Sequence, residues 1–366
     1  MTPTIERIEA IPVSIPFTHQ GPPTGFGGTV WTHANFLLVR VTASDGVVGW
    51  GEAFGYNVIP ATRKVLEDIV APMAIGKSCN AIAGVMGELE RPLHLFGRSG
   101  PVQYALSGLD IALWDMAGKR AGMSVAQLLG TSGRTQVPAY TSLLRIGDPK
   151  LLREVCESVL GEGFRAVKLH ENIPALAVAA REALGPDIDL MLDVNCAWDA
   201  QAAREAARAL QPAQLTWLEE PIWPPEDMQG MNLLARESID LAAGENVANP
   251  MSFNALVDAP GMTYLQPSVT KVGGISAFVE VAHLAKLRGK QLAPHSPYFG
   301  PGYLASLQMA AVFPQIRWLE VFAMTLERPI FGGAELPDAQ AMITLPTGPG
   351  LGMDPDPEVL RAFAQH

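Results

Sequence analysis

Three acidic residues of this chain follow short apolar runs at equal intervals. Asp193 ends the run LMLD, Glu219 follows LTWL and Glu245 follows DLAAG, and each interval is 26 positions. An interval of this size accommodates one strand, one helix and two turns, so we expect the acids to recur at one end of a parallel barrel. Three carboxylates without a cysteine or histidine among them favour a hard divalent cation, Mg²⁺ or Mn²⁺, with one ion per chain.

Four more ionisable residues end other apolar runs. Lys168 and His170 stand two apart in RAVKLH, so they should share one face of a strand. His295 ends KQLAPH, and Glu320 lies in RWLEVF. A single histidine or acid at such a position is commonly a structural residue, for example a helix cap. Seven ionisable groups at the ends of six strand candidates instead predict an active site at a barrel mouth.

The composition limits the class of protein. The 366 residues are 48% apolar and 17% charged, which is typical of a compact enzyme with room for a barrel and a second domain. A net charge of -11 disfavours nucleic acid as a partner, no basic run suggests a membrane surface, and a small molecule is the expected partner. Three dispersed cysteines, a charged N-terminus and no apolar stretch of about 18 residues predict a cytoplasmic protein without a membrane span.

The first part of the chain, residues 1–133, has the pattern of an α+β domain. Strand candidates IERIEAIPVSIP, NFLLVRVTA and GVVGWGEA precede helical periodicity over residues 61–122. Residues 17–33 are rich in Gly, Pro and Thr, and we expect them to form a mobile loop.

Residues 134–340 alternate short apolar strands with amphipathic helices. Eight strand candidates are VPAYTSL, RAVKLH, LMLDVN, LTWLEE, LAAGEN, TYLQPS, KQLAPH and RWLEVF. A doubly wound sheet is the alternative, but polar residues at nearly every strand end favour a closed (β/α) barrel. Residues 341–366 are expected to return to the first domain. The glycines do not form GxGxxG after a strand, and HExxH, GxSxG and Walker patterns do not occur, so hydride transfer and zinc or serine hydrolysis are disfavoured.

Several of these features together resemble a known family. The three acids, GLDIALWDMAGK, KVGGIS and TLPTGPGLGMD make nearly the whole chain similar to the mandelate racemase and muconate lactonising branch of the enolase superfamily. The resemblance implies an α/β fold, a modified TIM (β/α) barrel with an N-terminal α+β capping domain. It also implies a Mg²⁺-dependent enzyme that acts on a carboxylic acid and assembles as a homo-oligomer, from dimer to octamer.

The resemblance also implies roles for individual residues. GEN at the third acid and the histidine ending the seventh strand are similar to the mandelate racemase subgroup. Lys168 and His170 stand where that subgroup carries a Lys-x-Lys or related pair, whose second member is a base. His295 would be the base or acid on the other substrate face, and Glu320 would hydrogen-bond a carboxylate oxygen. Asn195 would support the metal or contact the substrate.

One position departs from the subgroup. The seventh-strand histidine is normally held by an aspartate on the sixth strand, and the matching residue here is Ser268. Serine fixes a tautomer but supplies no negative charge, so we expect His295 to be less basic than in its relatives. Loss of activity and survival as a binding protein is the alternative outcome of such a change. The retained acids and bases favour an enzyme.

Removal of a proton next to a carboxylate requires stabilisation of the resulting enediolate. A cation held by the three acids would do this, Lys168 would add charge, and His170 would take the C2 proton. If a C3 hydroxyl is present, a protonated His295 would expel it as water and give a 2-keto-3-deoxy acid. Because a less basic histidine is a stronger acid, dehydration of an aldonic-type acid is the first expectation. Racemisation or epimerisation, and lactone cycloisomerisation, are the alternatives.

Specificity is expected in the capping domain. The loop 17–33 contributes His19, Trp31 and His33, and the segment 56–60 contributes Tyr56. The loop contains no lysine or arginine, which favours a monoacid over a diacid. The alternative is that Trp31 and the histidines only pack the lid.

Overall fold

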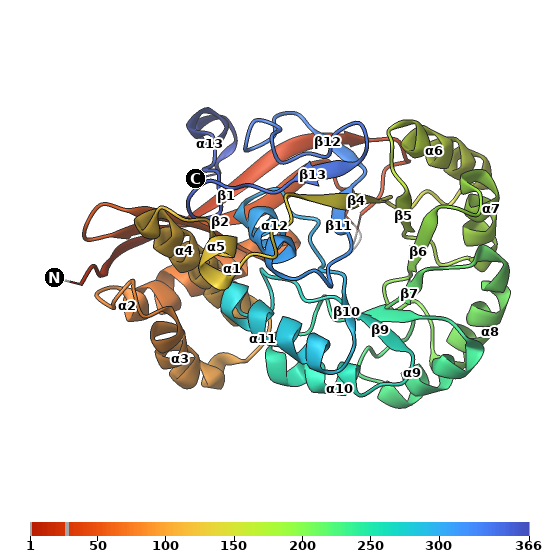
Figure 1. Ribbon diagram of the computed structural model, residues 1–366, viewed down its shortest axis with the longest axis horizontal. Coiled ribbons are helices and arrows are strands. Elements are labelled where there is room, and N and C mark those ends of the chain that lie inside the picture. Colours follow the sequence, from red (N-terminus) through yellow and green to blue (C-terminus); the bar gives the residue numbers. More distant parts are fainter. Residues whose placement is uncertain (1, 26–28, 366) are drawn as a thin grey trace.

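The computed structural model describes residues 2–25 and 29–365, which form two connected parts (Figure 1). An antiparallel sheet with helices occupies one side, and a ring of alternating strands and helices occupies the other. The chain therefore has the α/β fold of a modified TIM barrel with an N-terminal α+β capping domain. None of its described helices is long and apolar enough to cross a bilayer.

The capping domain is built on a four-stranded antiparallel sheet. Its order is β12 (Met324–Leu326), β1 (Ile5–His19), β2 (His33–Ala43) and β3 (Val48–Ala53). Five helices follow in the chain: α1 (Ile59–Val65), α2 (Ala71–Ala74), α3 (Ile82–Leu93), α4 (Pro101–Ala121) and α5 (Val125–Leu129). Helix α4 is buried along most of its length because it packs against β3 on one side and α11 (Gly274–Leu287) on the other. This packing joins the cap to the barrel.

The predicted loop over 17–33 was wrong at both ends. Residues 17–19 continue β1 and pair with β12, with Phe17 opposite Leu326, and His33 begins β2 opposite Pro16. The partner strand β12 comes from beyond the barrel, so local periodicity could not reveal the pairing. Residues 26–28 of this segment lie outside the described part of the chain.

Eight parallel strands form the barrel wall among the described residues. In chain order they are β4 (Gln136–Ser142), β5 (Ala166–Leu169), β6 (Asp189–Asp193), β7 (Trp217–Glu219), β8 (Leu241–Ala243), β9 (Met262–Leu265), β10 (Gln291–Leu292) and β11 (Leu319–Phe322). Each predicted strand overlaps one of them. Consecutive strands pair, and β11 pairs with β4. An isolated β-bridge joins Leu292 of β10 to Ile316, three residues before β11, and continues the ring.

Helices connect these strands and cover the outside of the ring (Figure 1). They are α6 (Pro149–Gly161), α7 (Pro174–Leu184), α8 (Ala200–Ala209), α9 (Met228–Leu234), α10 (Phe253–Val257), α11 and α12 (Pro301–Val312). Helices α6 and α8 begin at Asp148 and Asp199, whose side chains accept from backbone N–H groups in the first turn. These N-caps therefore fix the residue at which each of the two helices begins.

The barrel interior explains why polar residues converge at one end. A buried apolar cluster in the ring contains Tyr140, Ala166, Met191, Trp217, Ala242, Ala293 and Trp318. Side chains alternate along a strand, so the residue two positions later points to the same interior. Two positions after Ala166, Met191 and Trp217 stand Lys168, Asp193 and Glu219. The same step leads from Ala293 to His295 and from Trp318 to Glu320.

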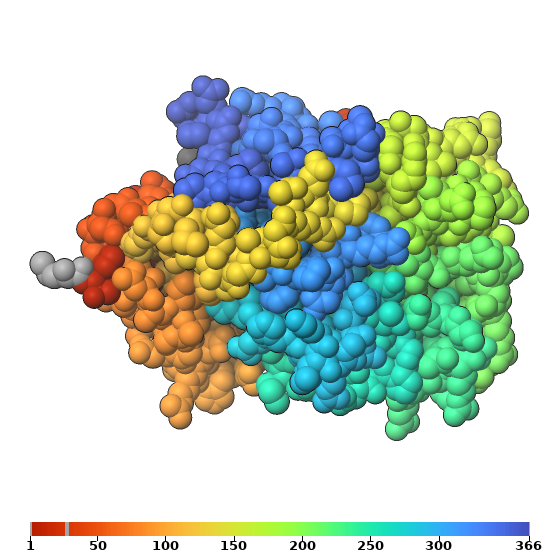
Figure 2. All heavy atoms as spheres, in the orientation of Figure 1, coloured from red at the N-terminus to blue at the C-terminus, as the bar shows by residue number. Residues whose placement is uncertain are grey.

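The C-terminal segment contacts both parts. Strand β13 (Met342–Thr344) pairs with β4, and α13 (Pro357–Phe363) lies against β1, where Gln365 N donates to Pro12 O at 2.8 Å. Figure 2 shows this blue segment lying against the yellow end of the capping domain, where Val125 N donates to Gly350 O at 2.8 Å. The segment therefore ties the barrel to the cap.

A buried carboxyl also joins the two parts. Glu52, in β3 of the cap, is 2% exposed, and its Oε2 accepts from Gly302 N in the first turn of α12 at 2.9 Å. Burial raises the pKa of Glu52 to about 8, although the N–H groups of Gly302 and Gly300 act in the opposite direction. The protonated carboxyl is therefore the form that the folded protein favours.

We expect the Glu52→Gln variant to lose part of the pH dependence of stability. Because the folded pKa is above the unfolded value, the stabilisation from protonation is complete below about pH 4.5 and is lost as pH rises to about 8. Between these two pH values, the wild-type free energy of unfolding should fall by on the order of 2–4 kcal/mol more than that of the variant. Thermal denaturation between these pH values measures the difference. The exposed Glu157→Gln variant is the control, and equal pH profiles for all three proteins would contradict the prediction.

Candidate active site

The three acids converge at the C-terminal ends of neighbouring strands. Asp193 and Glu219 are register partners at the ends of β6 and β7, and Glu245 follows β8 by two residues. One oxygen of each lies within 4.8 Å of the others. Gly244, with φ 126°, precedes Glu245, and a Cβ there would lie 2.7 Å from Phe253 Cε1. The triad is therefore set by the strand register and by one glycine turn.

The chemistry of the triad fits a divalent cation. All three side chains are oxygen acceptors, and burial together with the charges of Asp193 and Glu320 raises the pKa of Glu219 to about 8. A carboxylate destabilised in this way is stabilised by a positive ion. Asn195 Oδ1 and Glu320 Oε2 are buried next to the triad without a hydrogen-bond partner. A cation and a polar ligand would satisfy these groups.

Lys168 is the buried cation of the site. Its Nζ lies 2.9 Å from Glu219 Oε1, 2.8 Å from Glu320 Oε1 and 3.5 Å from Asp193 Oδ2, and the residue is 1% exposed. Burial disfavours the ammonium, but the surrounding carboxylates outweigh it and raise the pKa of Lys168 well above its usual value. Lys168 therefore stays protonated, and its positive charge is not in contact with bulk water.

His170 is held in one tautomer by the backbone. Its Nδ1 lies 2.7 Å from the carbonyl oxygen of Leu143, which can only accept, so Nδ1 carries the hydrogen. Nε2 lies 3.3 Å from Asp193 Oδ2. Burial disfavours the imidazolium, but the hydrogen bond and charge of Asp193 outweigh it and raise the pKa of His170. An uncharged His170 therefore has its lone pair at Nε2, on the side of the acids.

His295 meets the triad at its other end. Its Nε2 lies 3.0 Å from Glu245 Oε2, and four strands, β6 to β9, separate β5 from β10 in the sheet. Burial disfavours ionised Glu245, but His295 and Lys271 outweigh it and hold its pKa well below the usual range. The two imidazoles thus approach the carboxylates from opposite sides.

A cavity of about 750 Å³ lies over this end of the barrel. The barrel contributes polar groups that include His170, Asn195, Glu245, Lys271 and His295. The cap contributes Trp31, Phe54, Tyr56, Asn57 and Val58, and the barrel adds Trp223 from the loop after β7 and Phe322 at the end of β11. The Trp31 and Tyr56 rings pack with their centroids 5.2 Å apart. The cavity therefore has a polar floor and a largely aromatic roof.

Sequence comparison agrees with this architecture. The profile of the mandelate racemase/muconate lactonizing enzyme N-terminal domain matches residues 8–130, and that of the enolase C-terminal domain-like family matches residues 150–359. The chain belongs to the mandelate racemase/muconate lactonizing enzyme family. It is an enzyme of the enolase superfamily, of the dehydratase or racemase type.

Relatives and solved structures support the assignment. The chain is 31% identical to D-galactarolactone cycloisomerase of Agrobacterium fabrum, with 89% of this chain and 90% of the relative covered. It is 29% identical to L-talarate/galactarate dehydratase of Salmonella typhimurium, with coverage of 87% and 82%. A family protein of Paracoccus denitrificans, solved with magnesium, superposes with a TM-score of 0.86, 28% identity and coverage of 100% and 99%. The cofactor of this enolase-superfamily enzyme is Mg²⁺, and Asp193, Glu219 and Glu245 are the residues that could hold it.

The other predicted residues are distributed unevenly around this family site. Tyr56 and Trp31 line the cavity, and Asn195 lines it while its N–H donates to Asp193 Oδ1 at 2.8 Å. His19 instead lies against a separate cavity of about 610 Å³, where its Nδ1 accepts from Gly21 N. His33 is an exposed residue beside Thr32. Neither histidine is among the residues that line the cavity over the carboxylates, but His33 lines a small pocket together with the roof residues Trp31 and Tyr56.

Two residues that the sequence analysis did not single out belong to the site. Lys271 is 3% exposed, and its Nζ lies 2.9 Å from Asn246 Oδ1 and 3.5 Å from Glu245 Oε1. It begins the KVGGIS motif, so the motif itself was a signal. Tyr298 OH lies 3.0 Å from His295 Nδ1. No spacing rule of strands would have found Tyr298, because it lies in the loop after β10.

Proposed function

We propose that this enzyme dehydrates an acid sugar of the aldonic type to a 2-keto-3-deoxy acid. The observation that carries the proposal is the pair of imidazoles on opposite sides of the triad, which have different partners at Nδ1. His170 faces a carbonyl acceptor at 2.7 Å, whereas His295 faces a hydroxyl at 3.0 Å. A fixed lone pair suits a base, and a ring next to a hydroxyl suits an acid.

The first step is removal of the C2 proton. His170 takes this proton at Nε2, and the electron pair of the C–H bond moves into the carboxyl group to give an enediolate. Mg²⁺ held by Asp193, Glu219 and Glu245 would supply Lewis-acid stabilisation of the negative charge that develops on the carboxyl oxygens. The Lys168 ammonium adds positive charge beside them, in a site from which bulk water is excluded. Glu320 Oε2 has no partner and would donate to a carboxyl oxygen only if protonated; burial favours that form, but Lys168 and His295 outweigh burial and lower the pKa of Glu320.

The second step is loss of the C3 hydroxyl. A protonated His295 gives its Nε2 proton to the C3 oxygen, the enediolate electrons form the C2–C3 double bond, and the C3–O bond breaks to release water. The remaining enol takes up a proton at C3, loses the proton of its C2 hydroxyl and becomes the 2-keto-3-deoxy acid. The proton held by His170 returns to solvent and His295 takes one up from solvent, so the reaction is a net loss of one water.

The cavity supports a polyhydroxylated substrate. Aromatic side chains such as Trp31 and Trp223 offer flat apolar surface to a sugar chain, and Asn195 offers an amide. The preference for a monoacid rested on the absence of cations from residues 17–33. Lys271 supplies a cation from the barrel to the same cavity, so a diacid is an equal candidate.

We expect the Lys271→Met variant to separate these two substrate classes. If Lys271 binds a second carboxylate, KM for an aldarate should rise about 10- to 100-fold, the loss of one charge-assisted hydrogen bond, while KM for an aldonate changes little. Steady-state kinetics with both substrates measure the effect. An equal loss on both substrates, with weaker Mg²⁺ binding by calorimetry, would show that Lys271 instead holds Glu245.

Cycloisomerisation of a lactone is the second candidate. The relative that is 31% identical is named as a D-galactarolactone cycloisomerase, and the same base and acid could open a ring oxygen instead of expelling water. In this reaction His295 would protonate the ring oxygen, so the residues keep their roles. Racemisation or epimerisation would require His295 to protonate C2 itself.

Proton NMR in deuterium oxide tests the proposal. The purified enzyme with Mg²⁺ is incubated with a panel of aldonates, aldarates, 2-hydroxy acids and aldarolactones. A new deoxy methylene with loss of the C3 hydroxyl is the expected result. Ring opening of a lactone without a second product would favour the cycloisomerase, and deuterium at C2 without loss of water would favour a racemase.

A further inference from the structure

The Nδ1 side of His295 faces a chain of buried hydroxyl groups. Tyr298 OH lies 3.0 Å from Nδ1 and also contacts Ser268 Oγ, which lies 3.5 Å from Thr270 Oγ1. Ser268 and Thr270 are 0% exposed and Tyr298 is 6% exposed. Ser268 thus reaches His295 through the tyrosine hydroxyl.

The two ring nitrogens of His295 have different partners. Nε2 faces Glu245 Oε2 at 3.0 Å, and Nδ1 faces the tyrosine hydroxyl. A hydroxyl can accept from Nδ1 when that nitrogen carries a hydrogen and donate to it when it does not. Burial raises the pKa of Tyr298 well above its usual value, so Tyr298 keeps its hydrogen and can donate. Ser268 can in turn donate to the tyrosine oxygen, with Thr270 next in the chain.

We propose that Tyr298, anchored by Ser268, is a positioning residue that orients the His295 ring by its hydrogen bond to Nδ1. The residue acts through His295 and does not touch the reacting atoms. When Glu245 is engaged by the cation, the Tyr298 contact remains to hold the ring. This inference uses His295 as the acid of the proposed function and adds what sets its orientation.

A hydroxyl differs from an aspartate at this position in a testable way. A carboxylate accepts only, so it would place the hydrogen of an uncharged ring on Nδ1 and leave a lone pair at Nε2. A tyrosine hydroxyl can donate to the uncharged ring and accept from the charged one. His170, with a carbonyl at Nδ1, keeps the lone-pair arrangement. The two histidines therefore have different Nδ1 partners on the two sides of one cavity, a carbonyl for His170 and a hydroxyl for His295.

The first test is ¹⁵N NMR of the Mg²⁺-loaded enzyme with labelled histidine, in which the His295→Asn variant assigns the signal. Wild-type His295 is expected to give a single set of ring signals. The Tyr298→Phe variant should shift or broaden the Nδ1 signal, because Nδ1 loses its hydrogen-bond partner. The Tyr298→Phe/Ser268→Asp double variant should shift the Nδ1 signal to that of an N–H, since a carboxylate can only accept. Unchanged ring signals in Tyr298→Phe would overturn the proposal.

The second test separates kcat from KM. Tyr298→Phe should lower kcat by about 10- to 100-fold with KM changed by less than about threefold, the usual effect of removing an orienting partner. Exchange of the C2 hydrogen with deuterium oxide, which His170 performs, should persist. Tyr303→Phe is the matched control, since Tyr303 is a buried tyrosine of α12 whose hydroxyl has no partner. An unchanged kcat in Tyr298→Phe would count against the positioning role.

The Ser268→Ala variant tests the same role of Tyr298 if the Tyr298→Phe variant fails to fold. It retains the tyrosine and removes only its anchor, so the same changes in ring signals and kcat are expected at smaller size. The two hypotheses also fail separately. If the ring signals respond as described but no acid sugar loses water, the positioning of His295 stands and the proposed reaction is wrong. If an acid sugar is dehydrated but neither Tyr298→Phe nor Ser268→Ala changes the ring signals or kcat, the reaction stands and the role of Tyr298 is wrong.

Discussion

Replacing His170 with asparagine is expected to lower kcat by about 10²- to 10⁴-fold and to abolish exchange of the C2 hydrogen with deuterium oxide. The imidazole lone pair at Nε2 faces the triad because Leu143 O, at 2.7 Å, fixes the hydrogen on Nδ1. Asparagine has no comparable base. Steady-state kinetics and proton NMR of the recovered substrate measure both effects.

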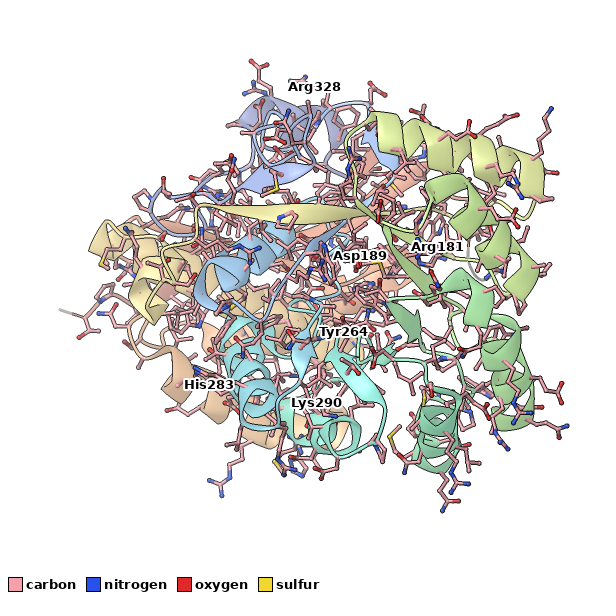
Figure 3. All side chains as sticks on the ribbon, turned by 45° about the vertical axis from the view of Figure 1, so that its right-hand side comes forward. Arg181, Asp189, Tyr264, His283, Lys290 and Arg328 are labelled. Carbon is pink, nitrogen blue, oxygen red and sulfur yellow. The ribbon has the colours of Figure 1, made fainter. Side chains whose placement is uncertain are left out.

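The matched control for this variant is His283→Asn. His283 is an exposed residue of α11, labelled in Figure 3, and its ring packs near Phe313 rather than at the barrel mouth. Its substitution should leave kcat and exchange unchanged. If His170→Asn exchanged the C2 hydrogen at the wild-type rate, the base would be another group of the cavity.

Asp193→Asn is expected to remove the bound Mg²⁺ and to lower kcat by about 10⁴-fold, since a metal contributes several kcal/mol to stabilisation of the developing charge. Asp193 shares the site with Glu219 and Glu245 within 4.8 Å, and one neutral ligand weakens the attraction of the set. Metal analysis of the purified variant should show much less than one Mg²⁺ per chain. Excess Mg²⁺ should restore only part of the activity.

Asp189→Asn provides the control on the same strand. Asp189 begins β6 at the end of the barrel away from the acids, is labelled in Figure 3, and pairs with Arg317 at 3.0 Å. It should retain the metal and nearly full kcat. Normal Mg²⁺ content in Asp193→Asn would show that the ion is held elsewhere.

Much of the fold and the metal site could be predicted from the sequence because both follow from short-range periodicity. Residues alternate in a strand, so Lys168 had to share the interior with Ala166, and each strand of the ring could be located by its apolar run. The interval of 26 positions repeated one strand–helix unit. The metal triad is confirmed as a set of neighbouring carboxylates, since equal units in a parallel barrel end on the same side.

The positions of His19 and His33 could not be obtained in this way. Their segment pairs with β12, which lies some 300 positions further along the chain, so its conformation depends on a contact that local sequence does not encode. The notion that both histidines face the substrate treated the segment as an independent lid. Strand pairing places His19 against a separate cavity and His33 in a small pocket beside Trp31 and Tyr56, which form the roof.

By itself the sequence determined the kind of chemistry: three acids at equal steps, a lysine and a histidine on one strand face, and a histidine opposite. Only the tertiary structure decided how the two imidazoles differ. Tyr298 lies 30 positions from Ser268 and comes between it and His295 because the loop after β10 folds back into the barrel mouth. Which atom a histidine presents depends on the donor or acceptor behind its ring, and that partner is chosen by packing, not by spacing in the chain.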